Sequence, residues 1–118
     1  MYGGKPKQVP EVGFYYHYKH DAVRGIRDYA YEVLGVGMQT EEHAPEEFFY
    51  EVVYRPLYDD SLIYKAGKFF DLRPLAMWMG EVTVDGIAKP RFTRITDQDQ
   101  IKDLELARTE MYGIEIAK

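Results

Sequence analysis

Few side chains in this sequence have the type and spacing that catalysis or metal binding requires. His17 and His20 are three residues apart, and such positions on a strand point to opposite faces, so the two imidazoles would not share a metal ion. Asp59 and Asp60 are carboxylates capable of acid or base chemistry, although chain neighbours rarely converge on one substrate. The chain has no Cys, and Ser61 lacks a G-x-S-x-G context. We therefore expect no metal site, no cofactor and no catalytic residue, with a small enzyme using Asp and His as the third alternative.

Aromatic and cationic side chains are better functional candidates. The sequence holds 11 Tyr, 6 Phe and 1 Trp, and small β-domains commonly bind peptides or bases on exposed aromatics beside a cation. Strand alternation assigns one set of side chains to the core: Phe14, Tyr16, Tyr50, Val52 and Tyr54. The residues expected to lie nearer a surface and to form the ligand-binding site are Tyr15, His17, Arg55, Tyr58, Arg73 and Arg91.

Two of these arginines have an alternative structural role. Arg55 and Arg73 each precede a proline, where few backbone conformations are open to the pair. A guanidinium in such a place either ties a loop carbonyl or a carboxylate such as Asp71 or Asp60, or it binds an anion of the ligand. The sequence leaves both roles open.

Length, composition and charge narrow the class of protein. The chain has 118 residues with 46% hydrophobic and 30% charged residues, which is typical of one globular domain. No run approaches the roughly 18 apolar residues of a membrane helix, residues 1–10 lack the apolar core of a signal peptide, and the lack of Cys fits a reducing cytoplasm. The formal net charge of −5 disfavours a general nucleic-acid or membrane binder. Binding of nucleotides or nucleic acid would be favoured by clustering of eight basic residues: Arg24, Arg27, Arg55, Lys65, Lys68, Arg73, Arg91 and Arg94.

The elements that must position these residues are mostly short strands. Period-two patterns predict strands at 12–19, 29–38, 48–55 and 68–72, and Asp85-Gly86 predicts a two-residue hairpin turn between two more. Gly35 and Gly37 indicate a bulge or a close backbone approach in the second strand. Residues 73–79 begin with Arg-Pro and carry helix formers, which predicts one helical turn.

The end of the chain changes to a helical period. The apolar spacing over 97–112, with Asp97 and Gln100 at its start and Gly113 after it, predicts an amphipathic helix. This helix either packs on its own domain or pairs with a second copy, so we expect a monomer or a weak homodimer. The predicted organisation is a flexible lead-in at 1–11, a β-domain at 12–95 and a helix with a tail at 96–118.

Five segments in one order carry a resemblance to a known family. They are GFYYHYK (13–19), YEVLGV (31–36), VVYRPLY (52–58), RPLAMWM (73–79) and DGIAKPRF (85–92). Over about residues 13–92 the chain resembles the small bacterial family called domain of unknown function 1653. The resemblance implies a small SH3-like barrel, in agreement with the five or six predicted strands, and it implies no reaction.

Several positions depart from the pattern of that family. Tyr16 stands where the family has Arg, Gln39 where it has His, Ala76 where it has Glu, and Asp59 where it has Gly. If the family builds a polar site on that Arg, His and Glu, this chain lacks three of its groups, so either the site lies elsewhere or the ligand differs.

Together these patterns predict an all-β, SH3-like barrel with an appended C-terminal helix. The expected function is that of a non-enzymatic, cytoplasmic binding module for a peptide or protein partner, acting through an aromatic and arginine surface. A nucleotide or nucleic-acid binding module is the alternative, and no membrane partner is expected.

Overall fold

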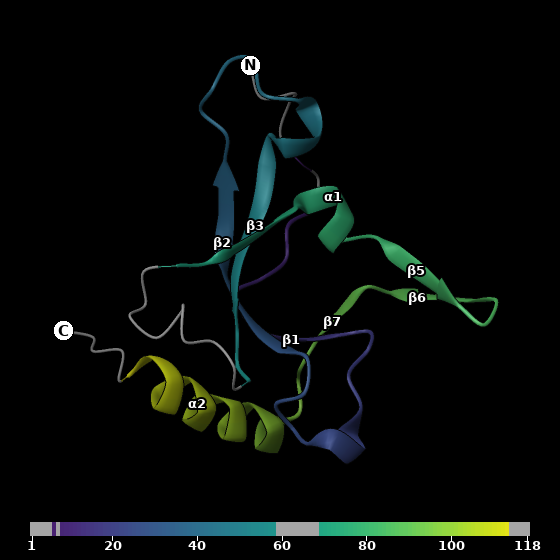
Figure 1. Cartoon of the computed structure of the whole chain (residues 1–118), viewed down its shortest axis with the longest axis vertical. Coiled ribbons are helices and arrows are strands. Elements are labelled where there is room, and N and C mark those ends of the chain that lie inside the picture. Colours follow the sequence, from purple (N-terminus) through teal and green to yellow (C-terminus); the bar gives the residue numbers. More distant parts are fainter. Residues whose placement is uncertain (1–5, 7, 59–68, 114–118) are drawn as a thin grey trace.

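Short strands make up most of this chain in its computed structural model, which describes residues 6, 8–58 and 69–113. Within that part there are seven β-strands, two α-helices and two 3₁₀ turns (Figure 1). In chain order they are β1 (Gly13–His17), η1 (Ala22–Arg24), β2 (Ala30–Met38), η2 (Glu46–Phe48), β3 (Tyr50–Pro56), β4 (Asp71–Pro74), α1 (Leu75–Trp78), β5 (Glu81–Val84), β6 (Ile87–Pro90), β7 (Phe92–Arg94) and α2 (Gln98–Tyr112).

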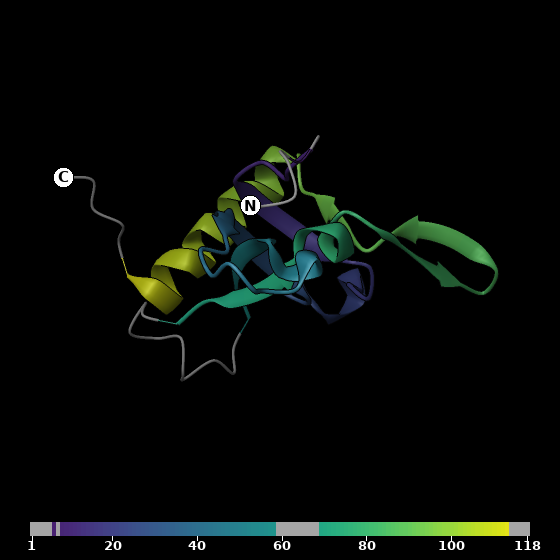
Figure 2. The same cartoon turned by 90° about the horizontal axis from the view of Figure 1, so that it is seen from above.

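The strands form two antiparallel sheets. The larger one has five strands in the order β4-β3-β2-β1-β7, and β5 with β6 forms a separate hairpin. Seen from above, this hairpin extends away from the rest of the molecule (Figure 2). The expectation of a mostly-β fold with a C-terminal helix is thus confirmed. The sheet has β4 and β7 as its edges, with no pairing between them among the described residues.

Local signals locate the turns better than the strand ends. Asp85 and Gly86 have φ angles of 52° and 78°, the left-handed pair that a tight hairpin turn requires, and the register shift between Val33 and Gly35 is the predicted bulge. The strand expected at 48–55 begins later, at Tyr50, because Pro45 caps the 3₁₀ turn η2 and this turn includes Phe48. The stretch after the hairpin turn was expected to be one strand, but it divides at Arg91 into β6 and β7.

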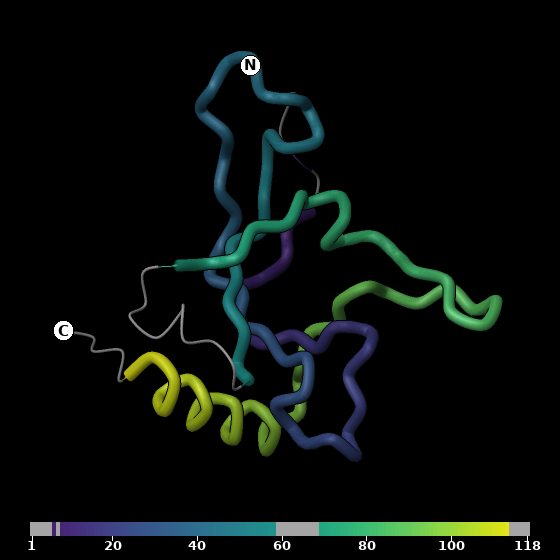
Figure 3. Tube along the Cα trace, in the orientation of Figure 1, coloured from purple at the N-terminus to yellow at the C-terminus, as the bar shows by residue number. Residues whose placement is uncertain are grey.

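The two faces of the five-stranded sheet bury different kinds of side chain. One face, here called the aromatic face, carries the larger core cluster: Tyr15, Tyr31, Val33, Val52, Tyr54, Leu75, Trp78 and Phe92. The other, the helix face, carries a smaller cluster together with α2: Phe14, Ala30, Leu57, Ile95 and Leu104. The Cα trace in Figure 3 shows that α2 lies at one end of β2 and β3 and that the other end of these two strands extends away from the helix.

Helix α2 packs on the sheet of its own chain. The Asp97 carboxylate accepts from the backbone N–H of Gln100 at 2.9 Å, and Gly113 ends the helix with φ of 85°, as the sequence predicts. Leu104 and Ala107 are completely buried against the helix face. Among the described residues, no helix has the length and apolar character needed to cross a membrane.

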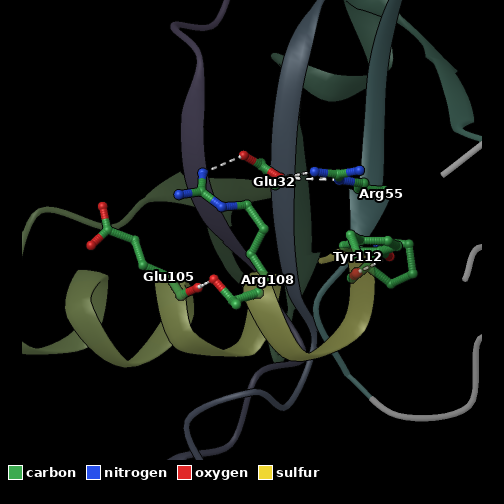
Figure 4. A network of polar contacts seen from close by, with 7 residues as sticks. Glu32, Arg55, Glu105, Arg108 and Tyr112 are labelled. Atoms are coloured by element: carbon green, nitrogen blue, oxygen red, sulfur yellow. Dashed lines mark hydrogen bonds and ion pairs between the residues drawn. The ribbon is translucent and has the colours of Figure 1, made fainter. Parts of the chain in front are cut away.

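A buried ion cluster joins α2 to two strands. Glu32 on β2 lies opposite Arg55 on β3, and the guanidinium of Arg55 donates to Glu32 Oε1 through Nε at 3.1 Å and Nη2 at 3.0 Å. Arg108 of α2 donates from Nη1 to Glu32 Oε2 at 2.9 Å (Figure 4). We call Glu32, Arg55 and Arg108 the Glu32 triad. Each oxygen of the carboxylate therefore has a charged donor, which compensates the cost of burying it.

The last turn of α2 covers this triad. The Tyr112 ring lies 4.0 Å from the guanidinium carbon of Arg55, and its hydroxyl donates to the carbonyl of Pro56 at 2.5 Å. Burial raises the pKa of Tyr112 to about 12, so the hydroxyl stays protonated and remains a donor. Helix, strand end and ion cluster are thus held as one unit.

The Glu32 triad predicts a large loss of stability on removing its carboxylate. Glu32→Gln should lower the free energy of unfolding by about 3–5 kcal/mol, because two guanidinium groups would lose the charge that compensates them. Urea denaturation followed by circular dichroism measures the difference.

The matched control is Glu110→Gln. Glu110 lies on the exposed side of α2, where it forms an ion pair with Arg27 of the β1–β2 connection. Losing this pair should change the free energy of unfolding by less than about 1 kcal/mol. Equal losses in the two variants would contradict a special role for the buried carboxylate.

Candidate functional site

Three of the six expected ligand-binding residues meet at one end of the aromatic face. They are His17 at the end of β1, Arg73 on β4 and Arg91 between β6 and β7. All three are half-buried. Together with Tyr29 and Phe92 they form a group that we call the arginine–aromatic patch.

Phe92 is the base of this patch. Its ring stacks on Trp78 with the centroids 3.6 Å apart and the planes 4° from parallel, so Trp78 covers one face of Phe92. The Trp78 side chain is itself 2% exposed and packs against Tyr15 and Tyr54. The base of the patch is therefore fixed by a packed aromatic core. The neighbouring Met77 and Met79 are exposed, so Trp78 is the residue of this segment that packs into the core beneath the patch.

Arg73 is held on the aromatic face by uncharged partners. Its guanidinium carbon lies 5.4 Å from the Phe92 centroid, Nε donates to the Tyr54 hydroxyl at 3.3 Å, and Nη1 lies 3.3 Å from the sulfur of Met77. Burial raises the pKa of Tyr54, so this hydroxyl is neutral and does not itself neutralise Arg73. Among the described residues Arg73 forms no ion pair, so a clamp on Asp71 is not seen, whereas Asp60, the other expected partner, lies outside the described residues.

Arg91 is positioned by its backbone. Its N–H donates to the Gly80 carbonyl at 3.0 Å, and its carbonyl accepts from the N–H of Tyr18 at 2.9 Å. The base of the β5–β6 hairpin is thereby tied to the end of β1. The side chain of Arg91 makes no hydrogen bond or ion pair with a described residue, and its Nε is buried.

His17 is a neutral imidazole within this positive environment. Burial, above all, lowers its pKa to about 4, and the charge of Arg73 acts in the same direction. Lys19 and Arg91 lower the pKa further. The Nδ1 atom accepts from the backbone N–H of Lys19 at 3.1 Å, so the neutral ring carries its proton on Nε2 and can donate from there. The ring packs edge-on against Phe92 with centroids 5.2 Å apart.

Tyr29 completes the patch from a strained backbone. Its φ of 51° lies in the left-handed region, which is costly for a residue with a side chain. Its carbonyl accepts from the N–H of His17 at 3.0 Å, and its ring stacks on the His17 ring with centroids 5.2 Å apart. The strained backbone conformation of Tyr29 thus occurs at the residue whose carbonyl and ring hold His17 in place.

The remaining expected site residues lie elsewhere. Tyr15 is 6% exposed and packs beneath Trp78, and Arg55 is 5% exposed within the Glu32 triad on the helix face, so the expectation that they lie nearer a surface is wrong. Both faces of the sheet are covered, which strand alternation does not reveal. Tyr58 is half-buried and lies next to Tyr31, the two hydroxyls being 3.1 Å apart.

The core assignments are confirmed for three residues of five. Phe14, Val52 and Tyr54 are buried, whereas Tyr16 and Tyr50 are half-buried. Tyr16 lies on the helix face, where its ring stacks on His20 at 3.5 Å. Tyr29 and Phe92 are the patch residues absent from the expected site, and for Tyr29 no local pattern signals the left-handed backbone.

Of the residues considered for catalysis, His17 is part of the patch. Asp59, Asp60 and Ser61, on which the enzyme alternative depends, lie outside the described residues, as do Lys65 and Lys68. Within residues 6, 8–58 and 69–113, no three His, Asp or Glu side chains come together as metal ligands. The described side chains of the patch are two cations, two aromatic rings and a neutral imidazole.

Comparisons with known proteins agree with the family resemblance. Residues 13–94 match the model of a family described as "Protein of unknown function (DUF1653)". The chain is also similar to a protein of that family from Bordetella bronchiseptica with a crystal structure, at 28% sequence identity and a TM-score of 0.49, over 75% of this chain and 94% of the other. A comparison with curated proteins found no match.

The environment of His17 predicts a specific dependence of stability on pH. Because the pKa of His17 is about 4 in the folded protein and about 6.5 when unperturbed, the unfolded chain takes up the proton first on acidification. The stability associated with the neutral ring is present above about pH 6.5 and is lost as the pH falls toward about 4. His17→Gln should therefore show a smaller decrease in the free energy of unfolding across this range.

Two measurements check this. The imidazole protons of His17 should titrate by NMR with a midpoint near 4, and urea denaturation at several pH values should give a flatter profile for His17→Gln than for the wild type. His43→Gln, which removes an exposed imidazole in the β2–β3 loop, is the control. A midpoint near 6.5 for His17 would contradict the predicted environment.

Proposed function

This chain belongs to the DUF1653 family of proteins of unknown function, and we propose that it is a non-enzymatic binding module for a peptide or protein partner. Its binding site in this proposal is the arginine–aromatic patch. Tyr58, next to Tyr31 on the same face, borders the site. The half-buried rings of His17 and Tyr29 lie beside two cations, and rings next to a cation are a common means of peptide recognition because they offer contact area at a small cost in entropy.

The observation that carries the proposal is that two half-buried arginines of the patch have no ion pair with a described residue, whereas four other arginines do. Arg27, Arg55, Arg94 and Arg108 each form an ion pair with a glutamate. Arg73 and Arg91 form none within the described part of the chain, although both are half-buried and act on the same imidazole. Arg24 also has no carboxylate partner there, but it is exposed on η1. Keeping two partly desolvated cations without counter-charges is unfavourable for a merely structural surface.

The finer assignment of the fold is part of the same proposal. We assign the five-stranded sheet to the SH3-like type. Support comes from the strand order, in which β1 pairs with the last strand β7 while β2, β3 and β4 follow one another as neighbours. The bulge at Val33 and Gly35 bends the long strand β2, as a sheet that curls toward closure requires.

A mononucleotide is the second candidate ligand. The stacked rings of His17 and Tyr29 beside two arginines are a combination that could take a base and a phosphate. The net charge of −5 disfavours a longer nucleic acid at this site, because the chain as a whole repels a polyanion at long range.

An NMR titration tests the proposal. Blocked six-residue peptide pools and AMP are added separately to the ¹⁵N-labelled chain. Peptides should shift the amide signals of His17, Arg73, Arg91 and Phe92, and Arg73→Gln should weaken binding about tenfold or more, since a hydrogen bond to a charged group contributes about 1.5–3 kcal/mol.

Arg24→Gln is the matched control, because it removes the same charge from an exposed position outside the patch. It should bind like the wild type. Shifts confined to residues outside the patch, or no shift with any peptide pool, would contradict the proposed function. A response to AMP alone would favour the second candidate.

A further inference from the structure

The patch concentrates positive charge over an apolar base. Arg73 and Arg91 both lower the pKa of His17, so their charges act on one small region, and the packed rings of Phe92 and Trp78 lie beneath it. Charges in such a partly desolvated place interact more strongly than they do in water. An anionic group bound beside the imidazole would be attracted by both positive charges.

The donors of the patch point to the same chemistry. The Nε of Arg91 is buried and has no acceptor among the described residues, and a buried polar group of this kind is rare in folded proteins. The Nη1 of Arg73 has only the weak acceptor sulfur of Met77. His17, whose Nδ1 is occupied by the Lys19 amide, adds an Nε2–H donor. The patch thus holds several N–H donors and few acceptors that use them.

We infer that the patch recognises an oxyanion, supplied by the carboxylate of an acidic side chain in the peptide partner. This inference rests on the proposed function and gives it a ligand chemistry. A carboxylate matches the planar fork of a guanidinium, and turning the Arg91 side chain toward it would give the buried Nε its acceptor. In this inference the half-buried rings of Tyr29 and His17 contact the apolar residues that flank the acidic one.

Binding of an oxyanion should also change the protonation of His17. The groups that act on its imidazole are Lys19, Arg73 and Arg91, with the Tyr18, Tyr29 and Phe92 rings against it, and every charged group among them is positive. A bound negative charge would offset them and favour the imidazolium. The titration midpoint of His17 should therefore move upward from about 4 in the complex.

The test compares two pools of blocked six-residue peptides in which one fixed position is Asp or Asn and all other positions are uncharged. By NMR of the ¹⁵N-labelled full chain, the Asp pool should bind at the patch roughly tenfold more tightly than the Asn pool. The Asp pool should also raise the His17 midpoint, and the Asn pool should leave it in place.

Variants assign the difference to the arginines. Arg91→Gln and Arg73→Lys should each remove most of the preference for Asp over Asn, the second because Lys keeps the charge but loses the planar fork. Arg24→Gln should retain the full preference. Circular dichroism verifies that each variant is folded, and using two positions keeps the test valid if one variant does not fold.

The outcomes separate this inference from the proposed function. Equal binding of both pools at the patch would overturn the oxyanion inference and leave the peptide-binding module in place. No binding by either pool would overturn the proposed function itself. If AMP binds at the patch and neither peptide pool does, the assignment of the oxyanion to an acidic peptide is overturned, and a phosphate is identified as its source.

Discussion

Glu32 is a carboxylate inside an otherwise apolar layer, and it can be buried there because two guanidinium groups share its oxygens. One guanidinium comes from the neighbouring strand and the other from α2. The same contact therefore fixes the pairing of β2 with β3 and the position of the helix across them. A carboxylate with two partners at set positions tolerates few alternative arrangements, so the triad contributes specificity as well as energy.

The two faces of the sheet use arginine in opposite ways. On the helix face, Arg55 and Arg108 are neutralised by Glu32, and an aromatic ring covers Arg55. On the aromatic face, Arg73 lies over Phe92, and both Arg73 and Arg91 act electrostatically on His17 without a described counter-ion. The same residue type is thus part of the internal structure on one side and available to a ligand on the other. The helix α2 covers one face, whereas α1 covers only part of the other, and the proposed binding site lies at the end of that second face.

Elements whose signals lie within a few residues are predictable from sequence. The Asp85-Gly86 turn, the cap of α2 at Asp97 and the glycine after it are of this kind, since local backbone chemistry decides them. Burial along β1 is not predictable in this way, because alternation separates the two faces of the sheet but does not say which face is covered. In this sheet both faces are covered at β1, and Phe14 and Tyr15 are both buried. The environment of Arg55 depends on Glu32, 23 residues away, and on Arg108 of a helix 76 residues from Glu32. The sequence identifies Arg73 and Arg91 as candidates by their residue type alone. It does not identify Tyr29, whose ring stacks on His17, because no local pattern predicts the left-handed backbone conformation of Tyr29.

The bulge in β2 has a consequence for changes in chain length. Val33 and Val36 both lie opposite residues of the aromatic face, Tyr54 and Val52, although an odd number of steps separates them. Leu34 is the extra residue that makes this possible. Losing one residue here would turn the second half of β2 inside out, placing Val36 toward the helix face. Relatives of this protein should therefore vary in length in the β2–β3 loop, where only turn residues would be gained or lost, and keep the number of residues between Glu32 and Val36.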